Sequence, residues 1–513
     1  MDAVSSRSSV DDIVARLERL PTSWWQVKTR IIVGVATFFD AFDALAIASV
    51  LPVIVPLWKL APQQIGLMIS AGFAGQLVGA LLFGFIAERY GRMTAMIWSI
   101  ALFAVLSLVC AFARDYNSLL IFRTLQGIGL GGEVPVAAVF ISELAKAHGR
   151  GRFVLLYELV FPIGLSAAAL VGLWVVPHLG WQWMFVIGAL PAFLALVLRW
   201  LLPESPRWLA VRGRNVEAEA AMALIEAETQ KATGRPLPEP RPIVATLVKP
   251  ASWSDLFGPH YLRRTLVVWV IWFSAYFVNY GLSAWLPTIY RAVFQLPLDV
   301  SLRYGLITQV VGLIGTAICA FTIDHVGRRL WFALSFVGGA LALSALKLYP
   351  TPTAEQVLTC ITIAYFFIST INIGVYLYTP ELYPTRVRAL GVGAATAWLR
   401  LASMIAPAIV GMIIGARLTP AQAPDVPTVF LLFGAVAAVA AVVTGLFAVE
   451  TKGRVLEEAS PYYAVNLLLE HYLCPKTGAH PRVKPEGRPF RDHALACANS
   501  TLARGAAVRQ PFT

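Results

Sequence analysis

Two aspartates lie inside an apolar run that is long enough to cross a lipid bilayer. Asp40 and Asp43 both fall within the run 30–56. A carboxylate at the centre of a membrane-spanning helix costs about 2.5–3.5 kcal/mol on insertion scales, and residues three apart point to roughly the same helix face. Two carboxylates that close in a medium of low dielectric cannot both ionise easily. The pair therefore predicts proton handling or substrate contact within the membrane; the alternative is carboxylates neutralised by buried partners for packing alone.

An arginine is the second exceptional charge. Arg400 is about midway along the apolar run 389–415. An arginine at that depth must face a cavity or a carboxylate, and its planar guanidinium suits a carboxylate through two parallel hydrogen bonds. We expect Arg400 to bind the carboxylate of a substrate in a water-reachable chamber that it shares with Asp40 and Asp43. The alternative is a permanent ion pair with one of these aspartates, and a dual role in which the substrate displaces that pair also stays open.

Aromatic and amide side chains in other apolar runs are candidates for the wall of the same chamber. A pocket for a planar acid needs aromatic rings and a few hydrogen-bonding groups. Each candidate singly could instead be a packing or interfacial residue. The expected substrate contacts besides Arg400 are Tyr276, Asn279, Tyr280, Gln309, Asn372 and Tyr376.

The composition predicts a membrane protein. The chain has 513 residues, of which 58% are hydrophobic and 14% charged, whereas a soluble domain carries about 25% charged residues. The net charge of +12 resides in short loops between apolar runs, which the positive-inside rule explains without a nucleic-acid partner. The five cysteines show no pairing or metal-ligand spacing, so we expect no disulfide framework, metal or cofactor. Residues 1–29 lack the features of a removable signal peptide.

Twelve apolar runs, each suited to a membrane-spanning helix, fall into two groups of six. They lie at about 30–56, 62–86, 93–113, 117–142, 153–176, 182–202, 264–290, 303–323, 330–349, 354–379, 389–415 and 427–449. Basic residues gather in alternate loops, which predicts that both termini are cytoplasmic. The expected parts are a cytoplasmic N-terminal segment 1–29, a first six-helix half 30–202, a cytoplasmic central loop with short helices 203–262, a second half 263–450 and a basic cytoplasmic tail 451–513.

The central loop carries a helix-start signal. Ser205 can cap a helix and Pro206 suits its first position. A short amphipathic helix is expected to follow through about Thr229.

The two groups of six repeat one another. The residues that recur at one constant displacement are Glu88 with Asp324, Gly91 with Gly327, Arg92 with Arg328, Arg150 with Arg386, and Arg152 with Arg388. Parallel repeats of this kind are typical of transporters whose substrate binds near the membrane midplane between the halves. The predicted fold class is an all-α membrane protein with twelve transmembrane helices in two pseudo-symmetric halves.

Carboxylates and arginines lie at the expected cytoplasmic ends of the runs in both halves. Ion pairs among them could latch the cytoplasmic side when the cavity faces outward, and such state-dependent contacts would bias a rocking equilibrium. The alternative is charges that only set topology, beside tight turns. The residues assigned to this cytoplasmic gate are Glu88, Arg89, Gly91, Arg92, Glu143, Arg150, Asp324, Gly327, Arg328, Glu381 and Arg388. The pairs considered are Glu143 or Glu381 with Arg92 or Arg328.

Several of these segments resemble signatures of the major facilitator superfamily. Residues 84–92 and 324–329 resemble the two copies of its loop signature, and 125–150, 203–209 and 380–388 resemble three signatures of the sugar porters. The resemblance spans about residues 25–452. It implies the major facilitator fold and transport by alternating access. No nucleophile–base constellation or phosphate-binding loop suggests an enzyme instead.

The two aspartates resemble a motif of particular groups of transporters within this superfamily. Asp40-Ala41-Phe42-Asp43 resembles the D-G-x-D motif in the first span of the aromatic-acid:proton symporters, with Ala41 in place of glycine, and is similar to the same region of niacin-type organic-acid transporters. Those symporters also carry an arginine in the eleventh span, as Arg400 does here.

Two more charged residues are assigned through this resemblance. Arg123 with Gly127 matches the superfamily's R-x-x-x-G pattern, which is linked in family members to proton transfer, and Glu133 follows in the same run. Both are assigned to proton coupling together with Asp40 and Asp43. The alternative for Arg123 is that it is a buried partner for another carboxylate.

The sequence therefore predicts a multi-pass transporter of the inner cell membrane, acting as a monomer. Its expected activity is proton-coupled symport of a small organic anion, an aromatic or heterocyclic monocarboxylate. A sugar or polyol symporter is the nearest alternative. An efflux carrier for organic cations and a nutrient sensor with a transporter fold stay open as well.

Overall fold

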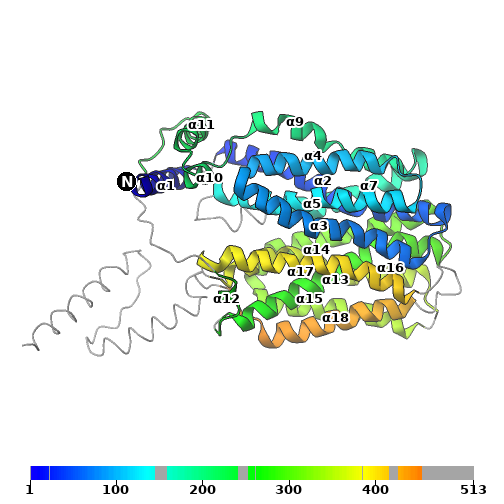
Figure 1. The fold of residues 1–513 in the computed structure, drawn as a ribbon. Helices are drawn as coiled ribbons and strands as arrows, with labels where there is room; N and C mark the ends of the chain where they lie inside the picture. The colour runs from blue at the N-terminus through cyan, green and yellow to red at the C-terminus, as the bar shows by residue number, and fades with distance from the viewer. Residues whose placement is uncertain are drawn as a thin grey trace, which may run out of the picture. The chain divides into compact units, whose positions relative to one another are not determined.

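The chain forms a bundle of long helices in the computed structural model (Figure 1). The structure describes residues 2–21, 23–144, 159–240, 252–259, 261–349, 351–383, 385–414 and 426–452. All of these belong to the first of two compact units, Met1–Gly453; the second, Arg454–Thr513, lies outside the described residues together with most of the expected tail.

The described residues contain 12 helical segments that are long and apolar enough to cross a membrane. The twelve expected spans are therefore confirmed. In chain order the helices are α2 (Trp24–Trp58), α3 (Pro62–Tyr90), α4 (Arg92–Cys110), α5 (Tyr116–Leu144), α7 (Val160–His178), α8 (Gln182–Gly188) continued by α9 (Pro191–Leu201), α13 (Leu262–Ala292), α14 (Leu298–Val326), α15 (Arg328–Ala345) continued by the 3₁₀ turn η1 (Leu346–Leu348), α16 (Ala354–Glu381), α17 (Thr385–Ile413) and α18 (Val426–Phe447).

Four further helices of the described residues lie outside the spans. They are α1 (Asp2–Arg19), α10 (Pro206–Val211), α11 (Asn215–Thr233) and α12 (Trp253–Leu256). The Ser205 hydroxyl accepts a hydrogen bond from the backbone N–H of Trp208 at 3.2 Å, and Pro206 begins α10, as predicted. The single helix expected through Thr229 is instead two helices, because the chain turns at Gly213 with a φ of +73°, a left-handed value that favours glycine.

Among the described residues, the two six-helix halves meet mainly along three helix pairs: α3 with α17, α2 with α13, and α7 with α14. The α3–α17 pair, which Figure 1 shows side by side, is tight at one end: the Pro407 carbonyl leaves no room for a Cβ at Gly66, and the Pro62 carbonyl leaves none at Gly411. Towards the other end, a Cβ at Gly84 or Gly393 would meet nothing within 4 Å. The interface between the halves is therefore packed at the start of α3 and more open towards its end.

Within the first half, α3 and α5 are in backbone contact. A Cβ at Gly75 would collide with the Thr124 carbonyl and the Cα of Gly127, and a Cβ at Gly79 would collide with the Ile128 carbonyl. Small residues at such positions let helices approach closely in a membrane, where dispersion contacts hold helices together. The glycines of this pair of helices therefore set how closely α5 lies to the centre of the protein.

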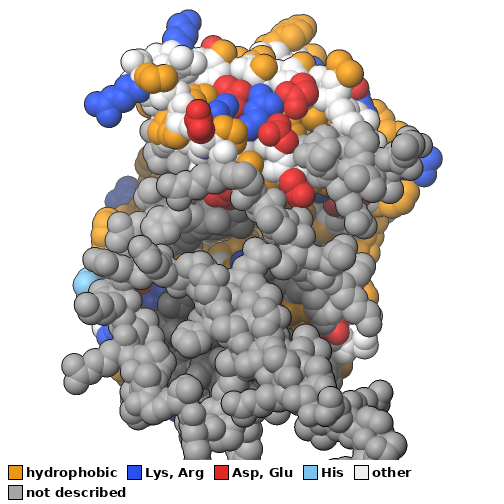
Figure 2. Space-filling model, turned by 90° about the vertical axis from the view of Figure 1, so that its left-hand side faces the viewer, with side chains coloured by type: hydrophobic (Ala, Val, Ile, Leu, Met, Phe, Trp, Pro, Cys, Tyr) orange, Lys and Arg blue, Asp and Glu red, His pale blue; other side chains and the backbone are white. Residues whose placement is uncertain are grey.

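The N-terminal helix α1 packs on α10 and α11. Arg16 donates hydrogen bonds to Glu226 at 2.8 Å and to Glu219 at 2.6 Å, and Arg19 donates to Glu226 at 2.5 Å. Figure 2, which looks onto the end of the bundle that carries these helices, shows acidic and basic side chains side by side there. The expected polar N-terminal segment thus contains a helix tied to α11 by ion pairs.

We predict that Gly75→Val lowers the melting temperature of the purified protein by about 4 °C or more, because overpacking a tight contact costs roughly 1–3 kcal/mol. Gly84→Val, on the same helix, is the matched control and should shift it by less than about 1 °C. Equal losses for the two variants would contradict the α3–α5 packing described here.

We also predict that the ion pairs of α1 fail in acid. Burial raises the pKa of Glu226, but hydrogen bonds from Arg16 and Arg19 outweigh it and hold the pKa below the ordinary 4.5. A carboxylate with a lowered pKa stabilises the folded state above its ordinary pKa, and that contribution is lost as the pH falls through the lowered value. Limited proteolysis of α1 at pH 7 should be about two- to fivefold faster in Glu226→Gln, the range of a partly exposed ion pair.

The difference in proteolysis rate between Glu226→Gln and the native chain should shrink progressively as the pH is lowered from 4.5. Glu228→Gln, also on α11, is the control and should match the native rate throughout this range. A difference between Glu226→Gln and the native chain that does not shrink in acid would contradict the assignment.

Candidate substrate cavity

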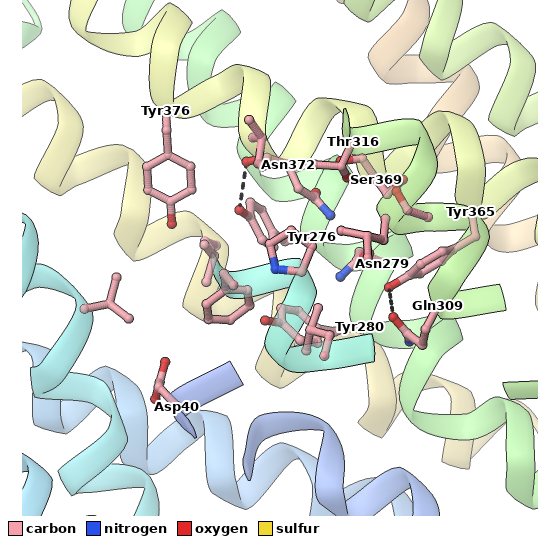
Figure 3. A pocket seen from close by; sticks show the side chains of 18 of the residues that line it. Asp40, Tyr276, Asn279, Tyr280, Gln309, Thr316, Tyr365, Ser369, Asn372 and Tyr376 are labelled. Atoms are coloured by element: carbon pink, nitrogen blue, oxygen red, sulfur yellow. Dashed lines mark hydrogen bonds between the residues drawn. The ribbon is translucent and has the colours of Figure 1, made fainter. Parts of the chain in front are cut away.

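A cavity of about 790 Å³, including the part open to solvent, lies between the two halves (Figure 3). Residues of α2, α3, α5 and α7 form one side of it, and residues of α13, α14, α16 and α17 form the other. The polar side chains in its lining are Asp40, Gln76, Tyr276, Asn279, Tyr280, Gln309, Thr316, Tyr365, Ser369, Asn372, Tyr376 and Arg400. Asp40 and every residue expected to contact substrate therefore share one cavity.

Asp40 comes from the middle of α2. Its side chain is 5% exposed, and its Oδ1 has no hydrogen-bond partner among the described residues. The carboxylate interacts electrostatically with Arg400 across the cavity, yet no ion pair within 4.0 Å joins the two side chains. A buried carboxylate oxygen with an unmet hydrogen bond is costly, so Asp40 is poised to accept a proton or a ligand.

Arg400 comes from the middle of α17 and is held by neutral oxygens. Its Nη1 donates to Gln76 Oε1 at 2.8 Å, and its Nη2 donates to the carbonyl of Gly131 at 3.2 Å. Gln76 and Gly131 belong to the first half, whereas Arg400 belongs to the second. A permanent ion pair with Asp40 or Asp43, one of the alternatives left open by the sequence, is absent among the described residues.

The aromatic side of the cavity comes from α13. Trp272, Tyr276 and Tyr280 occur one helical turn apart, and consecutive rings stack at centroid distances of 5.6 Å and 6.0 Å. The Tyr376 ring, from α16, meets the Trp272 ring edge-on at 4.8 Å. Stacked rings of this kind offer flat apolar surface to a planar ligand.

The far wall from Asp40 is neutral and polar (Figure 3). The Tyr365 hydroxyl donates to Gln309 Oε1 at 3.0 Å, and the Tyr276 hydroxyl donates to the Asn372 carbonyl at 3.1 Å. The side-chain oxygens of Asn279 and Asn372 are buried without a hydrogen-bond partner among the described residues. This wall therefore offers unmet hydrogen-bonding capacity to a ligand.

Asp43 does not line the cavity, and here the structure differs from the expectation of one chamber for both acids. Its side chain is 0% exposed; it accepts hydrogen bonds from Gln126 and, at 3.4 Å, from Ser107. Arg123 donates to Gln126 Oε1 at 2.9 Å and to the Asp43 carbonyl at 3.4 Å. Residues three apart differ by about 60° around a helix, which is enough to turn Asp40 towards the second half and Asp43 into the interior of the first.

Arg123 and Glu133 also lie outside the cavity lining. The side chain of Glu133 is 0% exposed and accepts a hydrogen bond from the Thr37 hydroxyl at 3.0 Å. The residues assigned to proton coupling thus divide between the cavity, which holds Asp40, and buried contacts of α2 with α4 and α5, which hold the other three.

The gate residues form two equivalent clusters, one in each half. In the first, Arg92 bonds Glu143 and Glu88, each at 3.0 Å. In the second, Arg328 bonds Glu381 at 3.1 Å and Asp324 at 2.7 Å. Every one of these pairs joins helices of the same half, so in this conformation the clusters do not link the halves as a latch.

The repeated turns require glycine. Gly91 has a φ of +109° and Gly327 a φ of +100°, values that L side chains rarely adopt. Among the other gate residues, Arg388 donates to the Tyr383 carbonyl at 3.2 Å, Arg89 lies over the Tyr90 ring, and Arg150 is outside the described residues.

Two carboxylates at these turns were not predicted as site residues from the sequence. Glu204 accepts from the backbone N–H of Arg92 at 3.0 Å, and Glu450 accepts from that of Arg328 at 3.0 Å. Each carboxylate caps the helix that follows the turn, where backbone N–H groups lack partners. Glu204 closely follows the sixth apolar run and Glu450 directly follows the twelfth. These equivalent positions in the two halves could have identified the two carboxylates as a pair. In the cavity, Gln76, Thr316, Tyr365 and Ser369 were also missed.

Two repeated six-helix halves around a central cavity with buried charges define a secondary transporter. The family model described as "Sugar (and other) transporter" matches residues 35–463. The chain therefore belongs to this family of the major facilitator superfamily, whose members are transporters and not enzymes.

Individual comparisons agree with this assignment. The chain is 34% identical over 460 residues to the niacin transporter NiaP of Acinetobacter baylyi, covering 87% of this chain and 99% of NiaP. It is 28% identical over 403 residues to the 4-hydroxybenzoate transporter PcaK of the same organism, covering 78% and 86%. The partially occluded inward-open xylose transporter XylE from E. coli matches the fold with a TM-score of 0.64 at 20% identity, covering 84% of this chain and 100% of XylE.

We predict that the two aspartates of α2 affect stability differently. Asp43→Asn removes a carboxylate that accepts hydrogen bonds from Gln126 and Ser107, and each hydrogen bond to a buried charged group contributes about 1.5–3 kcal/mol. The melting temperature of the purified protein should fall by about 5 °C or more. Asp40→Asn removes a carboxylate with an unmet oxygen and should leave the melting temperature unchanged or higher. A larger fall for Asp40→Asn would contradict this division.

Proposed function

We propose that this chain is a proton-coupled symporter of a small organic anion, an aromatic or heterocyclic monocarboxylate. The observation that carries the proposal is the presence of Asp40 and Arg400 in one cavity between the two halves. Opposite charges buried at mid-membrane are costly, and neither forms an ion pair with the other within 4.0 Å among the described residues. A carboxylate ligand and a proton would satisfy both groups.

Arg400 binds the substrate carboxylate in this proposal. Its guanidinium carries donors in the fork geometry that matches a carboxylate. The stacked rings of Tyr276 and Tyr280 support a flat ring beside it, and the amides of Asn279 and Asn372 bind polar atoms at the far end of the ligand. Relatives named as niacin and 4-hydroxybenzoate transporters are consistent with ligands of this size and shape.

Asp40 carries the proton that moves with the substrate. An ionised Asp40 repels an incoming carboxylate, whereas a protonated Asp40 does not, so proton binding and substrate binding strengthen one another. Asp43 and Arg123 form a compensated buried network behind this site, and Glu133 bonds α5 to α2 through Thr37. We assign these three to transmitting the protonation state of Asp40 to the packing of the first half.

Transport follows from rocking of the two halves about this cavity, in the inner cell membrane with both termini cytoplasmic. The clusters of Arg92 and Arg328 hold the ends of their own halves rigid in the present conformation. In the opposite conformation they meet and act as the cytoplasmic gate. The packed end of the α3–α17 pair, at Gly66 and Pro407, is the part that opens in that step.

A sugar or polyol symporter is the second candidate, because the far wall of the cavity is neutral. Amides and hydroxyls such as Asn279, Gln309 and Ser369 also suit the hydroxyl groups of a polyol. Competition separates the two candidates: unlabelled nicotinate should reduce uptake of labelled 4-hydroxybenzoate, and xylose or a polyol should not.

We predict that the native chain in proteoliposomes accumulates labelled 4-hydroxybenzoate or nicotinate when the outside is more acidic than the inside. Arg400→Ala should lower uptake by about thirtyfold or more, since it removes the charged partner of a buried carboxylate. Asp40→Asn should retain exchange of internal for external substrate but lose the response to the proton gradient.

Matched controls for these variants are Arg303→Ala, an exposed residue of α14, and Asp299→Asn, its ion-pair partner at 3.8 Å. Both controls should retain proton-driven uptake. Normal proton-driven uptake by well-expressed Asp40→Asn and Arg400→Ala proteins would refute the site, and accumulation of xylose instead of either acid would refute the substrate class.

A further inference from the structure

The guanidinium of Arg400 is shared between the two halves of the protein. It projects from α17 of the second half, and its hydrogen bonds at 2.8 Å and 3.2 Å go to Gln76 of α3 and to the Gly131 carbonyl of α5. Arg400 is 9% exposed and Gln76 is 8% exposed, so both side chains are largely buried. This polar contact crosses the interface between the halves in the wall of the substrate cavity.

Neutral oxygens are weak partners for a buried cation. A carboxylate adds the attraction of its negative charge to the hydrogen bonds of a guanidinium, and the neutral oxygen of an amide does not. Both partners of Arg400 are amide oxygens, one from a side chain and one from the backbone. The two amide oxygens therefore keep Arg400 hydrogen-bonded and oriented. Replacing one of them by a carboxylate would stabilise the guanidinium further.

A bidentate carboxylate needs two neighbouring N–H groups of the guanidinium. Nη1 is bonded to Gln76 and Nη2 to Gly131, and each of these nitrogens carries a second N–H group. A carboxylate that binds through the N–H group now bonded to Gln76 displaces the Gln76 side chain. The backbone carbonyl of Gly131 is fixed by the contact of α5 with α3, where Gly131 lies against the backbone of Gln76. The Gln76 side chain is the partner that can move.

We propose that Gln76 is a positioning residue that competes with the substrate for Arg400. It holds the guanidinium towards the cavity when no carboxylate is bound, gives it up when a carboxylate binds, and takes it back as the carboxylate leaves. The inference rests on the proposed function, because it requires Arg400 to bind a substrate carboxylate.

The exchange links binding to the interface between the halves. Arg400 and Gln76 lie on the α3–α17 pair, between its packed end at Gly66 and its open end at Gly84. Breaking their hydrogen bond removes a contact between halves at this midpoint. A ligand that changes contacts between two conformations shifts the equilibrium between them, so carboxylate binding at Arg400 loosens the interface where the halves rock.

The test compares two substitutions of similar size that change the acceptor in opposite ways. Gln76→Met removes the competing acceptor and should lower the Kd for 4-hydroxybenzoate by about two- to tenfold, the range of one net hydrogen bond. Gln76→Glu places a carboxylate beside Arg400 that mimics the substrate and should raise the Kd by about thirtyfold or more. Isothermal titration of the purified full chain measures both.

A kinetic readout separates positioning from a structural role. If Gln76 helps to release the substrate by taking back the guanidinium, Gln76→Met should lower the KM for 4-hydroxybenzoate uptake and lower kcat as well. A variant that only damages the fold raises KM or lowers the amount of active protein. Gln230→Glu, at an exposed position of α11 outside the cavity lining, is the control and should leave Kd, KM and kcat unchanged.

Weaker binding by both Gln76→Met and Gln76→Glu, or no effect of either, would overturn the inference. If Gln76→Met does not purify as a monodisperse protein, Gln76→Asn replaces it, because the shorter amide cannot keep the bond to Arg400 and should shift Kd and KM in the same direction. The Arg400→Ala variant distinguishes failure of the proposed function from failure of the inference about Gln76. Normal carboxylate binding by that variant refutes the proposed function and this inference together, whereas lost binding without opposite shifts at position 76 refutes this inference alone.

Discussion

The high free-energy cost of placing a charge inside a bilayer organises this protein. Each buried charge must find a compensating partner or a polar cavity. The carboxylate of Asp43 accepts hydrogen bonds from side chains of α4 and α5. Asp40 and Arg400 instead face the space between the halves. The compensated charges hold the first half together. In the proposed function, a carboxylate ligand and a proton supply the partners that Arg400 and Asp40 lack in the space between the halves.

The same constraint explains how binding and movement are connected. The bonds of Arg400 cross the interface between the halves, and its partners are neutral oxygens. A carboxylate at this position is a stronger partner, so its arrival exchanges a contact between the halves for one with the ligand. The ion pairs of the clusters around Arg92 and Arg328, by contrast, lie within single halves, so in the proposed transport cycle each cluster moves with its own half.

The sequence predicts all twelve spans, and it predicts the charged and several of the neutral residues of the cavity. The spans and the two buried charges follow from hydropathy. Long apolar runs specify the twelve helices, and a charge within such a run, as at Asp40 or Arg400, is conspicuous. Gln76 was missed because a neutral amide in an apolar run is a far weaker signal. The separation of Asp43 from Asp40 could not be predicted either, since it depends on how α2 is rotated against its neighbours. The α1 helix was predictable, because Ile13, Leu17 and Leu20 are apolar residues at the spacing of one helix face. All three are buried.

The most direct measurement of the central claim is the number of protons taken up when substrate binds. Adding 4-hydroxybenzoate to the purified protein in weakly buffered solution near neutral pH should consume about one proton per bound molecule, because binding beside Asp40 favours its protonated form. The Asp40→Asn variant should bind the same ligand without proton uptake. Undiminished proton uptake by Asp40→Asn, or binding to the native chain without any, would contradict the claim that Asp40 and Arg400 serve proton and substrate in one cavity.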